Sequence, residues 1–113
     1  MKIVNLTPHT VNVCDENGSA MRSIEPSGKV LRLPTRAYAA GELDGIPLVR
    51  LSYEEPEDLP PVEDGTIYIV SSLMLEPLAA MGRRDFVAPD TSPGSVVRDE
   101  GGRITGVKRF IVA

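Results

Sequence analysis

Polar and apolar positions alternate over short stretches in the first third of the chain, and turn residues separate these stretches. Residues 10–14 alternate as a half-buried strand does. The following residues 15–18 contain Asn-Gly, the strongest short signal for a β-hairpin. Strands are also expected at residues 2–6, 20–24 and 29–33. The N-terminal part of the chain is therefore predicted to consist of short strands joined by tight turns.

The next third of the chain has a weaker pattern. Residues 34–44 are rich in small side chains and are interpreted as a loop, whereas residues 46–53 are expected to form a strand. Pro47 near the start of that strand favours an edge position. Residues 54–65 contain three prolines and are predicted to be an exposed linker. Six of the sixteen acidic residues lie there: Glu54, Glu55, Glu57, Asp58, Glu63 and Asp64.

The most informative stretch covers residues 66–91. Residues 67–70 are a continuous apolar run, which is typical of a central strand covered on both faces. Residues 73–81 are apolar on nearly all sides and predict a short, largely buried helix. A second strand is expected at residues 86–88. These elements form either a strand-helix-strand unit within one sheet or a helix that covers one side of a sheet.

Both ends of this predicted helix carry recognisable signals. Ser71 or Ser72 is suited to cap the first turn through its hydroxyl, and Gly82 is suited to follow the last turn. Pro77 conflicts with a helix that starts several residues earlier, because its ring clashes with the preceding turn. Either the helix kinks at Pro77, or Glu76 is its N-cap and Pro77 its first residue.

The C-terminal part predicts a second hairpin, with strands in 95–98 and 103–112 around a glycine-rich turn. The chain as a whole is expected to be a single α+β domain over residues 1–113. Its sheet is expected to be mostly antiparallel or mixed, with about seven short strands and one buried crossover helix.

Charge and cysteine content exclude several classes of function. The net charge of −4 argues against general nucleic-acid binding, which needs a surplus of cationic side chains, and disfavours binding to anionic membranes. The single cysteine, Cys14, cannot form an internal disulfide. Neither a signal peptide nor a membrane span is recognisable. A cytoplasmic protein without a bound cofactor or metal is expected.

The candidate ligand-binding residues flank the predicted helix. Ser71 and Ser72 lie before it, where free backbone N–H groups and hydroxyls attract anions. Arg83 and Arg84 follow its other end. The alternative is structural, with the serines as caps and the arginines as solvated charges near the C-terminal end of the helix. No glycine-rich phosphate loop accompanies these residues.

Three further candidates lie elsewhere in the chain. His9 is the only histidine, and either acts as a general base or is a hydrogen-bonded turn residue. Arg98 and Arg103 belong to a cluster around the last hairpin that also contains Lys108 and Arg109. This cluster either offers a cationic surface to a nucleotide or an acidic partner, with Arg98 and Lys108 on one face, or blocks edge pairing of strands. Neither a nucleophile elbow nor a zinc-ligand spacing is present.

Four segments resemble a family of short proteins encoded in phages, prophages and actinobacterial genomes: KIVNLTPHTVNV, IEPSG, GTIYIVSSL and RDEGGRITG. The resemblance spans most of the chain, with a TPHxVN start and an RDExGRIxG end. No activity is established for this family, so the resemblance assigns no catalytic residue. It implies a phage-linked, cytoplasmic setting and a small protein that binds or sequesters another molecule.

The sequence therefore predicts a non-enzymatic binding protein for a small anionic, nucleotide-like ligand or for a protein partner. Homo-oligomers are expected, because several short strands leave edges to be paired. Two alternatives remain open at this stage. One is a structural or assembly accessory protein of a phage, and the other is a small hydrolase that uses His9 with Asp90 or Asp99.

Overall fold

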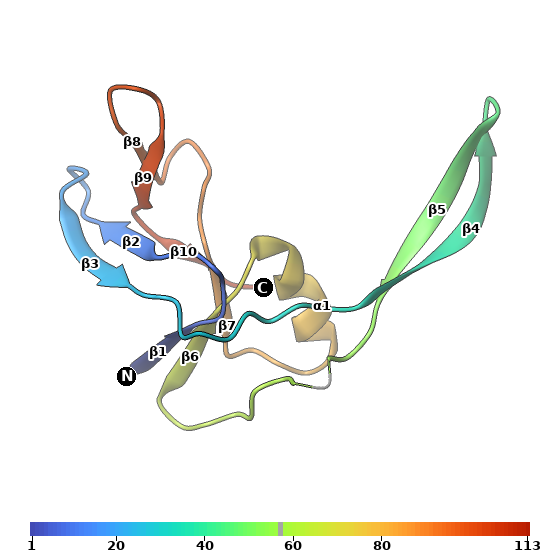
Figure 1. Ribbon diagram of the computed structural model, residues 1–113, viewed down its shortest axis with the longest axis horizontal. Coiled ribbons are helices and arrows are strands. Elements are labelled where there is room, and N and C mark those ends of the chain that lie inside the picture. Colours follow the sequence, from blue (N-terminus) through green and yellow to red (C-terminus); the bar gives the residue numbers. More distant parts are fainter. Residues whose placement is uncertain (57) are drawn as a thin grey trace. The chain divides into compact units, whose positions relative to one another are not determined.

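The computed structural model describes residues 1–56 and 58–113, which divide into two compact units. Residues 1–30 and 61–113 form the first unit, and residues 31–60 form the second. Figure 1 shows the elements of both. Glu57, one of the acidic residues of the predicted linker, lies outside the described residues. The sequence predicts a single domain over residues 1–113.

The first unit contains a four-stranded sheet with the order β1-β6-β7-β10. β1 and β7 both pair with β6 in parallel, and β10 pairs with β7 antiparallel. The strands are β1 (Lys2–Asn5), β6 (Thr66–Ile69), β7 (Phe86–Pro89) and β10 (Phe110–Ile111). Tyr68 and Ile69 in β6 are almost fully buried, as expected for a central strand covered on both faces.

A second four-stranded sheet of this unit has the order β3-β2-β9-β8. It contains β2 (Val11–Cys14), β3 (Ala20–Ile24), β8 (Val96–Arg98) and β9 (Ile104–Val107). Both hairpins predicted from the sequence, β2–β3 and β8–β9, are confirmed. Their turns contain Gly18 and Gly102, which have positive φ angles of 84° and 83°. The two hairpins join through a parallel contact at Val13 and Val107.

Of the two arrangements that the sequence leaves open for residues 66–91, the structure has the strand-helix-strand unit within one sheet, because β6 and β7 are parallel neighbours. A 3₁₀ turn, η1 (Ser72–Met74), leads into α1 (Leu75–Ala80) between them. Leu75 and Leu78 are buried. The prediction of a largely buried helix over residues 73–81 is wrong at Leu73, which is 75% exposed. Leu73 lies in the 3₁₀ turn before the helix, so the helical periodicity that buries Leu75 and Leu78 does not extend to it.

The capping prediction for α1 is wrong at the first turn of the helix and correct at its last turn. Ser71 makes no side-chain capping bond; its carbonyl accepts from the Met74 N–H at 3.0 Å instead. Pro77 is the third residue of α1. The N–H groups of the first helical turn have no acceptor within the helix, so the N–H that Pro77 lacks costs no hydrogen bond there. Neither placement considered for Pro77 is therefore correct. Gly82 follows the helix with a φ of 88°, as predicted.

Side chains from the two sheets meet in one hydrophobic core. Val11, Ile24 and Ile69 are its buried members. Ile3, Val13, Val87 and Phe110 pack against them. Because these residues come from both sheets, the first unit is built from two packed layers of strands.

The second unit contains the two-stranded sheet of β4 (Thr35–Leu43) and β5 (Ile46–Tyr53). The predicted loop at residues 34–44 is therefore wrong, and the predicted strand at residues 29–33 is absent. Asp44 and Gly45 have φ angles of 53° and 82°, the two positive values that a two-residue type I′ turn needs.

In total, residues 1–56 and 58–113 contain ten strands in three sheets, where the sequence predicted about seven in one sheet. The α+β class is confirmed. Within the described part of the chain, no helix is long and apolar enough to cross a membrane.

Candidate functional site

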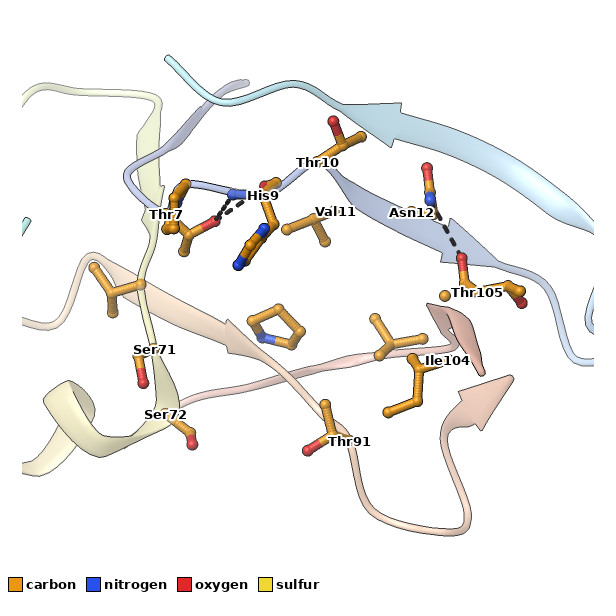
Figure 2. Close-up of a pocket in the computed structure, with 15 residues that line it drawn as sticks. Thr7, His9, Thr10, Val11, Asn12, Ser71, Ser72, Thr91, Ile104 and Thr105 are labelled. Atoms are coloured by element: carbon orange, nitrogen blue, oxygen red, sulfur yellow. Dashed lines mark hydrogen bonds between the residues drawn. The ribbon is translucent and has the colours of Figure 1, made fainter. Parts of the chain in front are cut away.

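A cleft of about 650 Å³ lies in the first unit, at the carboxyl ends of the parallel strands β1, β6 and β7. Carboxyl ends of parallel strands meet at one edge of a sheet, where ligand sites commonly form. The opposite wall comes from β2 and β9 of the second sheet (Figure 2). The lining residues are Thr7, Pro8, His9, Thr10, Val11, Asn12, Val70, Ser71, Ser72, Pro89, Thr91, Ile104, Thr105, Gly106 and Val107.

The loop that follows β1 is organised by Asn5, which is only 1% exposed. Its Nδ2 donates to the carbonyl oxygens of His9 at 2.8 Å and Ile24 at 3.0 Å. Its Oδ1 accepts from the Thr7 N–H at 2.9 Å, and the Thr7 hydroxyl lies 2.7 Å away. One buried amide thus ties the Thr-Pro-His loop to the end of β3.

This network holds the backbone of His9 and leaves its ring available. The His9 carbonyl accepts from Asn5, while the imidazole has no hydrogen-bond partner among the described residues. Figure 2 shows the ring directed from its loop into the cleft. His9 is therefore presented to the cleft by the fold around it.

Three hydroxyls in the cleft are also available. Within residues 1–56 and 58–113, the side chains of Ser71, Ser72 and Thr91 have no hydrogen-bond partner, and all three are exposed. By contrast, the Thr10 hydroxyl donates to the Glu25 carboxylate at 3.3 Å, and the Thr105 hydroxyl donates to the carbonyl of Val97 at 3.2 Å. These last two are already engaged by the protein.

The chemistry of the lining is neutral. None of its fifteen residues is Lys, Arg, Asp or Glu, and His9 is the only residue of the lining with an ionisable side chain. Apolar side chains such as Val11, Val70 and Ile104 provide the rest of the surface. Small-molecule pockets are commonly about 300–1,000 Å³, largely apolar, with a few convergent polar groups. The cleft fits that description.

The structure brings together three of the seven predicted ligand-binding residues, His9, Ser71 and Ser72. The four arginines do not line the cleft. The Arg83 guanidinium pairs with Asp85 through hydrogen bonds of 3.0 and 2.8 Å, which raise the pKa of Arg83, and it stacks over Phe86. Arg84 is exposed.

The other two arginines belong to the β8–β9 hairpin. The Arg98 Nη1 donates to the carbonyl of Gly102 at 2.7 Å. The backbone N–H of Arg103 donates to Asp99 Oδ1 at 3.0 Å. Arg98 therefore closes the turn between β8 and β9, and Asp99, considered as a partner for His9, is engaged in the same turn.

Asp90, the other carboxylate considered as a partner for His9, is held by Arg109. The Arg109 Nε lies 2.6 Å from Asp90 Oδ2, and the Ser92 N–H donates to Asp90 Oδ1 at 3.0 Å. These bonds, the one to Arg109 above all, lower the pKa of Asp90 from 3.8 to about 2. The network fixes the chain next to Thr91 at the cleft.

This pairing predicts a specific acid sensitivity. Because the pKa of Asp90 is lower in the folded protein, its stabilising contribution is complete above about pH 3.8 and is lost as the pH falls towards about 2. We expect Asp90→Asn to lower the free energy of unfolding at neutral pH and to differ less from the wild type at pH 2. Chemical denaturation across this range measures the difference. If the two proteins differ in the free energy of unfolding by the same amount at every pH, the lowered pKa of Asp90 is contradicted.

Thr7, Thr91, Ile104 and the other lining residues were not recognised from the sequence. A signal for Thr91 was present: it follows the second strand of a strand-helix-strand unit, as Ser71 follows the first. In parallel strands these positions share an edge. The wall formed by β9 has no such local signal, because it depends on the packing of the two sheets.

Comparison of the chain with models of known protein families, with curated proteins and with solved structures gives no match. Among the described residues, no group of three or more His, Cys, Asp or Glu side chains is arranged to hold a metal ion. Inferences about function therefore rest on the cleft itself.

Proposed function

We propose that the protein is a non-enzymatic binding protein that holds a small molecule in this cleft. The observation that carries the proposal is that four polar groups without a hydrogen-bond partner among the described residues line one cleft at the ends of three parallel strands. These groups are the His9 imidazole and the hydroxyls of Ser71, Ser72 and Thr91. They line the cleft together with apolar side chains, a combination that orients a ligand by hydrogen bonds and retains it by burial.

The lining also narrows the class of ligand. Without a cationic side chain in the lining, the cleft suits an uncharged ring system that carries hydroxyl or carbonyl groups. A nucleotide-like ligand would place its base and sugar there, with its phosphate directed towards solvent. The phage-linked setting stays a prediction from the sequence.

Blocking the cleft tests this proposal. Ser72 is exposed and makes no side-chain hydrogen bond with described residues, so we expect Ser72→Trp to fold while its indole occupies the cleft. A panel of nucleosides, nucleotides and sugars is screened by thermal shift. A ligand that stabilises the wild type should fail to stabilise Ser72→Trp, and His9→Ala should weaken binding by about tenfold, the equivalent of one lost hydrogen bond.

Ser19→Trp is the matched control, because Ser19 is also exposed and lies in the β2–β3 turn outside the cleft lining. It should bind as the wild type does. The proposal is wrong if no member of the panel shifts the melting temperature, or if Ser72→Trp binds as tightly as Ser19→Trp.

A further inference from the structure

The charge of the cleft depends on one side chain. His9 is the only histidine of the chain and the only ionisable residue of the lining. Its imidazole has no hydrogen-bond partner among the described residues. Histidine side chains change from neutral to positively charged between about pH 8 and about pH 5. One proton therefore decides whether the lining is neutral or carries a positive charge.

The other elements that form the cleft offer no charge to the His9 ring. The lining residues contributed by β2, the end of β6, η1, the end of β7 and β9 are all uncharged. The charged residues that adjoin the lining in the chain or bond to it are Glu25, Asp90, Arg103 and Lys108. Within residues 1–56 and 58–113, none of them makes a hydrogen bond or an ion pair with the imidazole. A protonated His9 therefore has no carboxylate to pair with.

A ligand in the cleft changes the surroundings of this ring. In the free protein His9 is exposed, so water solvates its positive charge. A ligand that fills the cleft takes the place of that water. Removing a charge from water is costly unless an opposite charge replaces the water, and an uncharged ligand supplies none. The neutral imidazole avoids this cost and still offers the ligand one hydrogen-bond donor and one acceptor.

We infer that the cleft is a pH-dependent site, which binds its ligand when His9 is neutral and releases it as His9 gains a proton. This inference rests on the proposed function, because it concerns the uncharged ligand proposed for the same cleft. Binding is then strongest at neutral to slightly alkaline pH and weakens as the pH falls. An anionic ligand would show the opposite dependence, because its charge would pair with the imidazolium.

The Asp90–Arg109 pair keeps its charge over the same range of pH. The pKa of Asp90 is about 2, so its carboxylate stays ionised while His9 changes charge. The hydrogen bonds that Asp90 accepts from Arg109 and from the Ser92 N–H therefore persist. The segment that carries Thr91 is held throughout, and the pH dependence of binding belongs to the ring of His9.

Isothermal titration calorimetry tests the inference, with the uncharged nucleoside or sugar that gives the largest thermal shift as the probe. Between about pH 8 and about pH 5, we expect binding to the wild type to weaken by about tenfold, an ordinary coupling between two ligands. His9→Gln keeps a hydrogen-bonding side chain but takes up no proton, so its affinity should be the same at both pH values. Glu25→Gln, the matched control, removes the carboxylate bonded to Thr10 and should keep the full pH dependence. Circular dichroism at both pH values confirms that each protein is folded.

Proton release gives a second, independent measurement. Binding to the wild type within this range of pH should release protons, which makes the measured heat depend on the ionisation enthalpy of the buffer. His9→Gln should release none. Equal affinity of the wild type at both pH values, tighter binding at the lower pH, or an unchanged pH dependence in His9→Gln would overturn the inference and leave the proposed function standing. If no uncharged probe binds at either pH, the proposed function is wrong, and this inference is wrong with it.

Discussion

Replacing Asn5 with alanine is expected to lower the free energy of unfolding by about 3 kcal/mol, since a buried polar group left without its partner costs roughly 1–3 kcal/mol. The substitution removes both N–H donors of Nδ2, so the carbonyl of Ile24 loses its bond to Asn5 and the carbonyl of His9 keeps only the Thr7 hydroxyl at 3.1 Å. The N–H of Thr7 also loses its acceptor. Chemical denaturation at neutral pH measures the loss.

The same substitution should also affect ligand binding in the cleft. With the loop after β1 released, His9 is no longer held in position, and we expect ligand binding to weaken in protein that is still folded. Asn17→Ala is the control, because Asn17 is exposed and its side chain makes no hydrogen bond with described residues. It should change stability by less than about 0.5 kcal/mol. An equal effect of the two substitutions would contradict the role assigned to Asn5.

Gly106→Ala is the second substitution with a large expected effect. A Cβ atom at Gly106 would lie 2.7 Å from the Sγ of Cys14 and 2.9 Å from the carbonyl oxygen of Asn12. The carbonyl belongs to β2, so the two strands must separate to admit the methyl group. We expect a loss of about 1–3 kcal/mol, the usual cost of overpacking, measured by chemical denaturation.

Gly101→Ala is the matched control, because the nearest atom to its Cβ, Asp99 Oδ1, is at 3.4 Å and its φ is not positive. It should be nearly neutral. Adding Cys14→Ala to Gly106→Ala should restore part of the loss, since one of the two close contacts disappears. If Gly106→Ala is as stable as Gly101→Ala, the close contact between β2 and β9 is wrong.

The sequence predicted best where a turn and its flanking strands had matching signals. Asn17-Gly18 and Gly101-Gly102 identified the two hairpins of the first unit, which the structure confirms. Asp44-Gly45 is an equally good signal for the β4–β5 hairpin. Ala39, Ala40 and Gly41 have low strand propensity, so the local pattern indicates a loop, but the pairing with β5 outweighs that propensity.

The candidate site was predictable in part, and for a physical reason. Residues that follow parallel strands gather at one edge, which explains why Ser71 and Ser72 lie in the cleft. His9 joins them only because β1 pairs with β6, a contact between segments about sixty residues apart that no local pattern reveals. The arginines were selected for their charge, but Arg83 is engaged by Asp85 and Arg98 by Gly102.

The most direct measurement is an NMR titration of the isotope-labelled wild-type protein with the ligand that gives the largest thermal shift. The account predicts that the amide signals of residues 7, 9–12, 70–72 and 105–107 move together and saturate with one affinity. Signals that move only at Arg83, Arg84, Arg98 and Arg103, with the cleft amides unchanged, would contradict it.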